Sequence, residues 1–119
     1  MVNEVTMSVS LPPAIKRHVL SQPLAATVLQ TSLGAGESEA ITLALQENAR
    51  LIVLDDRPAR RTAESLGLKV IGTLGLLLSA KRKGLVRQVK PLIQALDSHH
   101  FHVAPDIARK VILDAGEVP

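Results

Sequence analysis

A four-residue apolar run, Leu51 to Leu54, limits the fold more than any other segment, because charged residues bound it on both sides. Such an uninterrupted run predicts a strand that is buried on both faces, as in a parallel sheet. Helices are predicted before it, over 37–48, and after it, over 58–66, and a second strand follows over 69–71. Because helices and strands alternate, we predict an α/β fold with a short parallel sheet.

Three further helices are predicted in the second half of the chain, over 73–84, 86–97 and from 105 onward. The first follows Gly72 in a tight turn, with Thr73 as the predicted cap. In the second, Pro91 either kinks the helix or begins a new one. In the last helix, Ile107 is predicted to face the core.

The segment that precedes residue 33 carries weaker signals. We predict a strand over 15–20, and a helix from Ser21 to about Ser32 with Pro23 in its first turn. There is no internal repeat, and 119 residues are enough for one domain around one core. We therefore expect a single domain over residues 1–119.

Composition excludes several classes of protein. A hydrophobic content of 46% excludes a disordered chain, and no apolar run approaches the roughly 18 residues that span a bilayer. The first ten residues lack a basic start followed by an apolar stretch, so no secretion signal is expected. Without cysteine there are no disulfides and no thiolate metal ligands, which is compatible with the cytoplasm. We expect a cytoplasmic protein without membrane contact.

Acidic residues gather where a binding site is expected. Asp55 and Asp56 end the apolar strand, and ligands of α/β sheets lie beyond the carboxyl ends of the strands. Glu37 lies in the first turn of the preceding helix, which runs antiparallel to that strand. Its carboxylate should therefore approach Asp55. Carboxylates that share one crevice repel each other unless a cation binds, and ligation by oxygen alone indicates Mg²⁺ or Mn²⁺.

A structural explanation competes with the metal site. Acidic residues in a first turn stabilise the helix dipole, and an aspartate after a strand commonly caps a helix, so spacing alone favours this explanation. Arg57 and Arg61 are four residues apart and share a helix face beside the aspartates. That face either grips phosphate or is simply solvated. A net charge of +3 permits contact with a polyanion without demanding it.

Short segments across about two thirds of the chain resemble a PIN-related family of small prokaryotic proteins, close to the toxin ribonucleases of toxin–antitoxin modules. They are Gly36 to Ile41, Leu51 to Arg57 with Arg60-Arg61, Gly72 to Gly75, Ala80-Lys81, Gly84-Leu85, Lys90 to Leu92, and Phe101 through the last helix. The resemblance implies a three-layer α/β/α fold and a Mg²⁺- or Mn²⁺-dependent ribonuclease. Its catalytic and metal-binding acids would be Glu37, Asp55 or the adjacent Asp56, and Glu4. Arg57 and Arg61 would then bind the RNA.

The sequence departs from the family pattern at its N-terminus. The family's first acid ends an opening strand, and here nothing precedes Met1. We therefore expect an N-terminally truncated PIN-like fold, explained by a misassigned start codon, by trimming or by a natural remnant. Losing that strand should leave edges unpaired, so a second copy of the chain is expected to fill the gap. Without the first acid, nuclease activity should be weak or absent.

Two function classes follow from these observations. The first is a PIN-type ribonuclease, the toxin of a toxin–antitoxin pair, with RNA and an antitoxin protein as partners. The second is a non-catalytic α/β module that dimerises or binds a partner, with its carboxylates acting only as helix caps. A nucleotide-binding domain ranks last, because Gly72 to Gly75 lacks the lysine of a phosphate loop.

Overall fold

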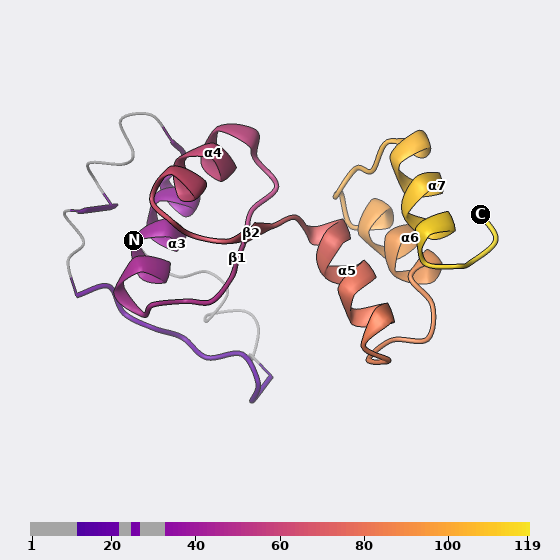
Figure 1. The fold of residues 1–119 in the computed structure, drawn as a ribbon, viewed down its shortest axis with the longest axis horizontal. Helices are drawn as coiled ribbons and strands as arrows, with labels where there is room; N and C mark the ends of the chain where they lie inside the picture. Colours follow the sequence, from indigo (N-terminus) through magenta and orange to yellow (C-terminus); the bar gives the residue numbers. More distant parts are fainter. Residues whose placement is uncertain (1–11, 22–24, 27–32) are drawn as a thin grey trace. The chain divides into compact units, whose positions relative to one another are not determined.

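The computed structural model describes residues 12–21, 25–26 and 33–119, which contain five complete helices and one pair of strands (Figure 1). Contacts divide the chain into two compact units, Met1–Asn48 and Ala49–Pro119. The predicted α/β class and the short parallel sheet are confirmed. Glu4 and most of the helix predicted over 21–32 lie outside the described residues.

The first unit contains α3, which spans Ala35–Gln46 and confirms the helix predicted over 37–48. Its buried face is built on Ser38, Ile41 and Thr42, at the spacing of one helix face. The hydroxyl groups of Ser38 and Thr42 can be buried because both are hydrogen-bonded. Ser38 donates to the carbonyl of Gly34 at 2.8 Å, and Thr42 donates to the carbonyl of Ser38 at 2.8 Å. Their polar atoms are thereby satisfied inside the fold.

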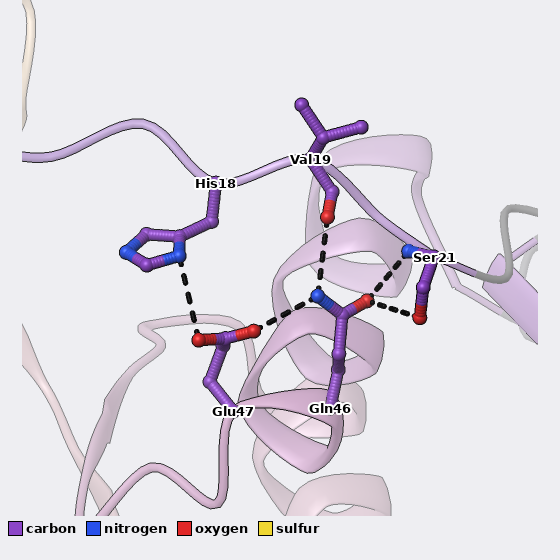
Figure 2. Close-up of polar contacts among 5 residues, drawn as sticks. All are labelled: His18, Val19, Ser21, Gln46 and Glu47. Carbon is purple, nitrogen blue, oxygen red and sulfur yellow. Dashed lines mark hydrogen bonds and ion pairs between the residues drawn. The ribbon is translucent and has the colours of Figure 1, made fainter.

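The strand predicted over 15–20 is wrong, because these residues have no strand structure and join no sheet among the described strands. Side-chain bonds from the end of α3 hold the segment instead (Figure 2). The Gln46 amide donates to the carbonyl of Val19 at 3.1 Å and accepts from the Ser21 amide at 2.7 Å. Nδ1 of His18 lies 3.4 Å from Oε1 of Glu47. Local composition gave no means of knowing that these backbone groups would bond to a glutamine.

The second unit begins with a strand–helix–strand arrangement: β1 (Ile52–Val53), α4 (Arg57–Ser65) and β2 (Val70–Ile71). The strands are parallel, with Ile52 opposite Val70 and Val53 opposite Ile71, and α4 contacts β2. Helix α4 has alanine on its inner face, at Ala59 and Ala63, and both are fully buried.

Burial alternates along β1, which corrects the expected burial on both faces. Ile52 and Leu54 are buried, whereas Leu51 and Val53 are 47% and 43% exposed. Side chains of successive strand residues point to opposite faces, so one face of β1 is covered and the other is open to solvent. An entirely apolar run does not reveal this difference, because both faces carry the same kind of residue.

Three helices complete the second unit: α5 (Thr73–Arg82), α6 (Lys90–Ser98) and α7 (Pro105–Asp114), drawn in orange to yellow in Figure 1. Pro91 lies in the first turn of α6, so it begins a new helix rather than kinking a longer one. The core among these helices is aliphatic and consists of Val89, Ile93, Val103 and Ile112. Ile107, predicted to face inward, is 50% exposed, which corrects that prediction.

A carboxylate near the C-terminus of the chain caps the N-terminal end of α6. Glu117 accepts hydrogen bonds from the backbone N–H groups of Val89 and Lys90 and from the ammonium group of Lys81. Helix N-termini leave their first amides without intrahelical partners, and here the chain supplies the partner from beyond α7. Lys81 lies in the last turn of α5, so Glu117 connects the ends of two helices.

Candidate metal and phosphate site at the end of β1

Asp55 and Asp56 follow the C-terminal end of β1, and both are exposed. They differ in what their side chains do. Asp56 is the N-cap of α4, and its Oδ2 accepts a hydrogen bond of 3.0 Å from the backbone N–H of Ala59. Pro58, whose missing N–H costs nothing in a first turn, completes this helix start. The capping role considered from the sequence is therefore present for Asp56.

Asp55 points to the turn that follows the neighbouring strand β2. Its Oδ1 accepts a hydrogen bond of 2.9 Å from the backbone N–H of Thr73, and its Oδ2 accepts one of 2.6 Å from the Thr73 hydroxyl. This contact follows from the parallel pairing, because β1 and β2 end at the same edge and Thr73 comes two residues after β2. The N-cap position of α5 is Gly72, which has no side-chain cap, so Thr73 is not the cap that the sequence suggested.

Three arginines follow the acidic corner on α4. Arg57, Arg60 and Arg61 line a shallow hollow of about 240 Å³ together with Glu64. Arg60 and Arg61 come three and four residues after Arg57, so both lie beside it on the helix surface, as predicted for Arg57 and Arg61. Within the described ranges none of the three arginines forms an ion pair. Among the described residues, these guanidinium groups therefore have no carboxylate partner.

The structure adds Arg60 to the pair that spacing had singled out. Its Nη1 atom would lie 3.8 Å from a Cβ placed on Gly72, and Asp55 Oδ1 would lie 3.1 Å from the same point. Arg60 is thus the arginine that reaches the turn where Asp55 binds Thr73. The i, i+3, i+4 spacing could have indicated it, but only the pairing of β1 with β2 brings this turn beside α4.

Glu37 lies in the first turn of α3 and is half-buried. Its carboxylate turns back along the helix, and Oε1 lies 2.7 Å from the point where a Cβ on Gly34 would stand. A negative charge here complements the positive end of the helix dipole. Glu37 belongs to the first unit and Asp55 to the second, and their approach to one another stays a prediction.

The donor chemistry of the acidic residues fits a hard divalent cation, since carboxylate oxygens are the ligands that Mg²⁺ and Mn²⁺ prefer. Asp55 keeps this capacity, because a carboxylate has about four lone-pair positions and Thr73 uses two. In the part of the chain that the structure covers, no three histidine or acidic side chains are close enough to hold a metal ion.

A family model described as a PIN domain matches residues 3–117 of the chain. The chain belongs to the PIN-domain family. PIN domains are commonly nucleases that depend on divalent metal ions. The match spans both units and includes Glu4, Glu37, Asp55 and Asp56, while the single domain expected from the sequence stays a prediction.

Two further comparisons add no relative, since no curated protein and no solved structure matches the chain. Among the helices described for this PIN-domain chain, none is both long and apolar enough to cross a bilayer.

Proposed function

We propose that the chain is a Mg²⁺- or Mn²⁺-dependent ribonuclease of the PIN type, with Asp55 at the centre of its metal site. Asp56, Glu37 and Glu4 are the further acidic residues of this proposed site. The observation that supports it is the exposed carboxylate of Asp55 at the end of a parallel strand, with the arginine hollow of α4 beginning two residues later. Negative ligands for a cation thus adjoin positive ligands for phosphate.

Each group has a separate role in this proposal. A bound Mg²⁺ or Mn²⁺ supplies activation of water and neutralises charge on the phosphate oxygens. Asp55 would hold the cation, and Thr73 donates hydrogen bonds to both oxygens of the Asp55 carboxylate. Arg57 and Arg61 bind the phosphates of the RNA backbone through charge-assisted hydrogen bonds, which position the strand without reading its sequence.

The position of Arg57 favours a binding role over a purely structural one. It is the first residue of α4, where the helix dipole is positive and a cationic side chain gains nothing from it. An arginine near a helix C-terminus would stabilise the helix through its dipole, but an arginine at the N-terminus does not. An anion bound in the hollow would benefit from the side chains and from the helix terminus together.

Titration with Mn²⁺ by calorimetry tests the metal site directly. We expect the wild-type protein to bind Mn²⁺, and Asp55→Asn and Glu37→Gln to weaken binding sharply. Asp114→Asn, at an exposed position at the end of α7, is the matched control and should bind like wild type. Absence of Mn²⁺ binding by the wild-type protein would reject the proposal.

Binding to single-stranded RNA at several salt concentrations tests the arginine hollow. With single-stranded RNA, loss of one phosphate contact should reduce the slope of log affinity against log salt by about 0.7, so Arg57→Ala with Arg61→Ala should reduce it by about 1.4. Equal slopes for wild type and the double variant would remove these residues from the RNA site. The weak or absent RNA cleavage expected from the sequence stays a prediction, so binding is the sharper readout.

A non-catalytic module is the second candidate function, and one observation favours it. Both aspartates at the end of β1 bond to the first turns of helices, Asp56 to α4 and Asp55 to α5. If the chain is such a module, Asp55→Asn would change its stability, and neither the wild type nor any variant would bind Mn²⁺. An antitoxin partner, a toxin role and pairing with a second copy of the chain remain predictions for either candidate.

A further inference from the structure

The turn between β2 and α5 holds both oxygens of the Asp55 carboxylate. The Thr73 backbone N–H lies 2.9 Å from Oδ1, and the Thr73 hydroxyl lies 2.6 Å from Oδ2. Two donors on one residue fix the rotation of the carboxylate as well as its position. The hydroxyl is not needed to cap the helix, because the backbone N–H already has its acceptor in Oδ1.

Gly72 leaves the room for this contact. Its backbone has φ −86° and ψ 170°, an extended conformation open to any residue, so no conformational requirement demands glycine here. A Cβ at this position, however, would lie 3.1 Å from Oδ1 of Asp55. The absent side chain therefore allows Asp55 to close onto Thr73.

The carboxylate held in this way stays exposed. With two of its roughly four lone-pair positions used, the others remain for a cation or for water. Side chains that bind a metal are commonly oriented by a second hydrogen-bond partner, and loss of such a partner typically weakens metal affinity about 10- to 100-fold. Thr73 is a hydrogen-bond partner of this kind for Asp55.

We propose that Thr73 is a positioning residue, which orients the Asp55 carboxylate for a divalent cation through its hydroxyl group. The inference rests on the metal site of the proposed function and adds a residue to it. The competing explanation is that Asp55 only secures the first turn of α5, in which case the hydroxyl affects stability but not a cation.

Thr73→Val and Thr73→Ser separate the two explanations, with Mn²⁺ affinity and the thermal midpoint measured for each. Valine has nearly the same shape but no hydroxyl, whereas serine keeps the hydroxyl. We expect Thr73→Val to weaken Mn²⁺ binding about 10- to 100-fold and Thr73→Ser to remain near wild type. Should Thr73→Val be unfolded during the titration, Thr73→Ala, which also removes the hydroxyl, takes its place.

The result that overturns the inference is a Thr73→Val protein with a lower thermal midpoint but wild-type Mn²⁺ affinity. Asp55→Asn distinguishes this outcome from failure of the proposed function. If wild type binds Mn²⁺, Asp55→Asn does not, and Thr73→Val binds normally, then the metal site stands and only the role of Thr73 is wrong. If wild type does not bind Mn²⁺, both are rejected.

Discussion

The backbone N–H of Val89 donates a hydrogen bond of 2.7 Å to Oε2 of Glu117, although 28 residues separate them in the chain. Lys90 N–H donates to Oε1 at 3.1 Å, and the Lys81 ammonium group donates to Oε2 at 3.0 Å. Burial of Glu117, whose side chain is 9% exposed, acts to raise its pKa. The bonds from Val89, Lys81 and Lys90 together outweigh burial and hold the pKa below its ordinary value of 4.5.

We expect Glu117→Gln to lower the thermal midpoint at neutral pH, because the amide carries no charge and can accept through only one atom. A folded-state pKa below the unfolded one means that the carboxylate stabilises the fold above pH 4.5 and loses this effect as pH falls through the folded pKa. The gap between wild type and variant should therefore shrink on acidification. Melting curves by circular dichroism test this, with the exposed Glu64→Gln as control. A gap that widens at low pH would contradict it.

Substitution at Asp56 separates capping from metal binding. Asp56→Ala removes the acceptor of the Ala59 amide and should cost about 0.5–2 kcal/mol of unfolding free energy. Asp56→Asn keeps an oxygen at the same place and caps about as well, so stability should be near wild type. If Asp56 also binds the cation, Asp56→Asn alone should weaken Mn²⁺ binding at unchanged stability. Urea unfolding of both variants checks the cap, and equal stability of alanine and asparagine would contradict it.

Two isoleucines test where the core of the three C-terminal helices lies. Ile93, on α6, is 4% exposed, and Ile93→Ala should cost about 2–5 kcal/mol through lost burial and an unfilled cavity. Ile107→Ala is the same chemical change at a half-exposed position of α7 and should cost less than about 1 kcal/mol, since alanine also favours the helix. Equal losses in urea unfolding would show that Ile107 faces the core after all.

The sequence identified the elements better than the contacts between them. The run from Leu51 to Leu54, Pro105 and the glycines at 67 and 84 are local signals, and they predict β1, α4, α5 and α7 from the sequence alone. Gly67 and Gly84 indeed adopt positive φ, 84° and 75°, beyond the ends of α4 and α5.

The candidate site depended on contacts that no local pattern carries. Asp55 meets Thr73 across 18 residues because two strands pair in one register, and Glu117 meets α6 only because α7 folds back. The sequence indicated Asp55, Asp56, Arg57 and Arg61 by residue type and spacing, but it did not indicate what holds them. The structure supplies Thr73 and Arg60 as their neighbours.

Alanine at two glycines tests how closely Asp55 approaches the turn before α5. Gly36→Ala, in α3, introduces a Cβ that meets no described atom within 4 Å beyond its chain neighbours and the adjoining helix backbone, and should raise stability by about 0.4–1 kcal/mol through reduced unfolded-state entropy. Gly72→Ala gains the same entropic term, but its Cβ would press on Asp55 Oδ1 at 3.1 Å and weaken a hydrogen bond worth about 0.5–1.5 kcal/mol. We therefore expect Gly72→Ala to be less stable than Gly36→Ala by about 1 kcal/mol in urea unfolding. Equal gains in the two variants would mean that the carboxylate does not close onto Thr73 in solution.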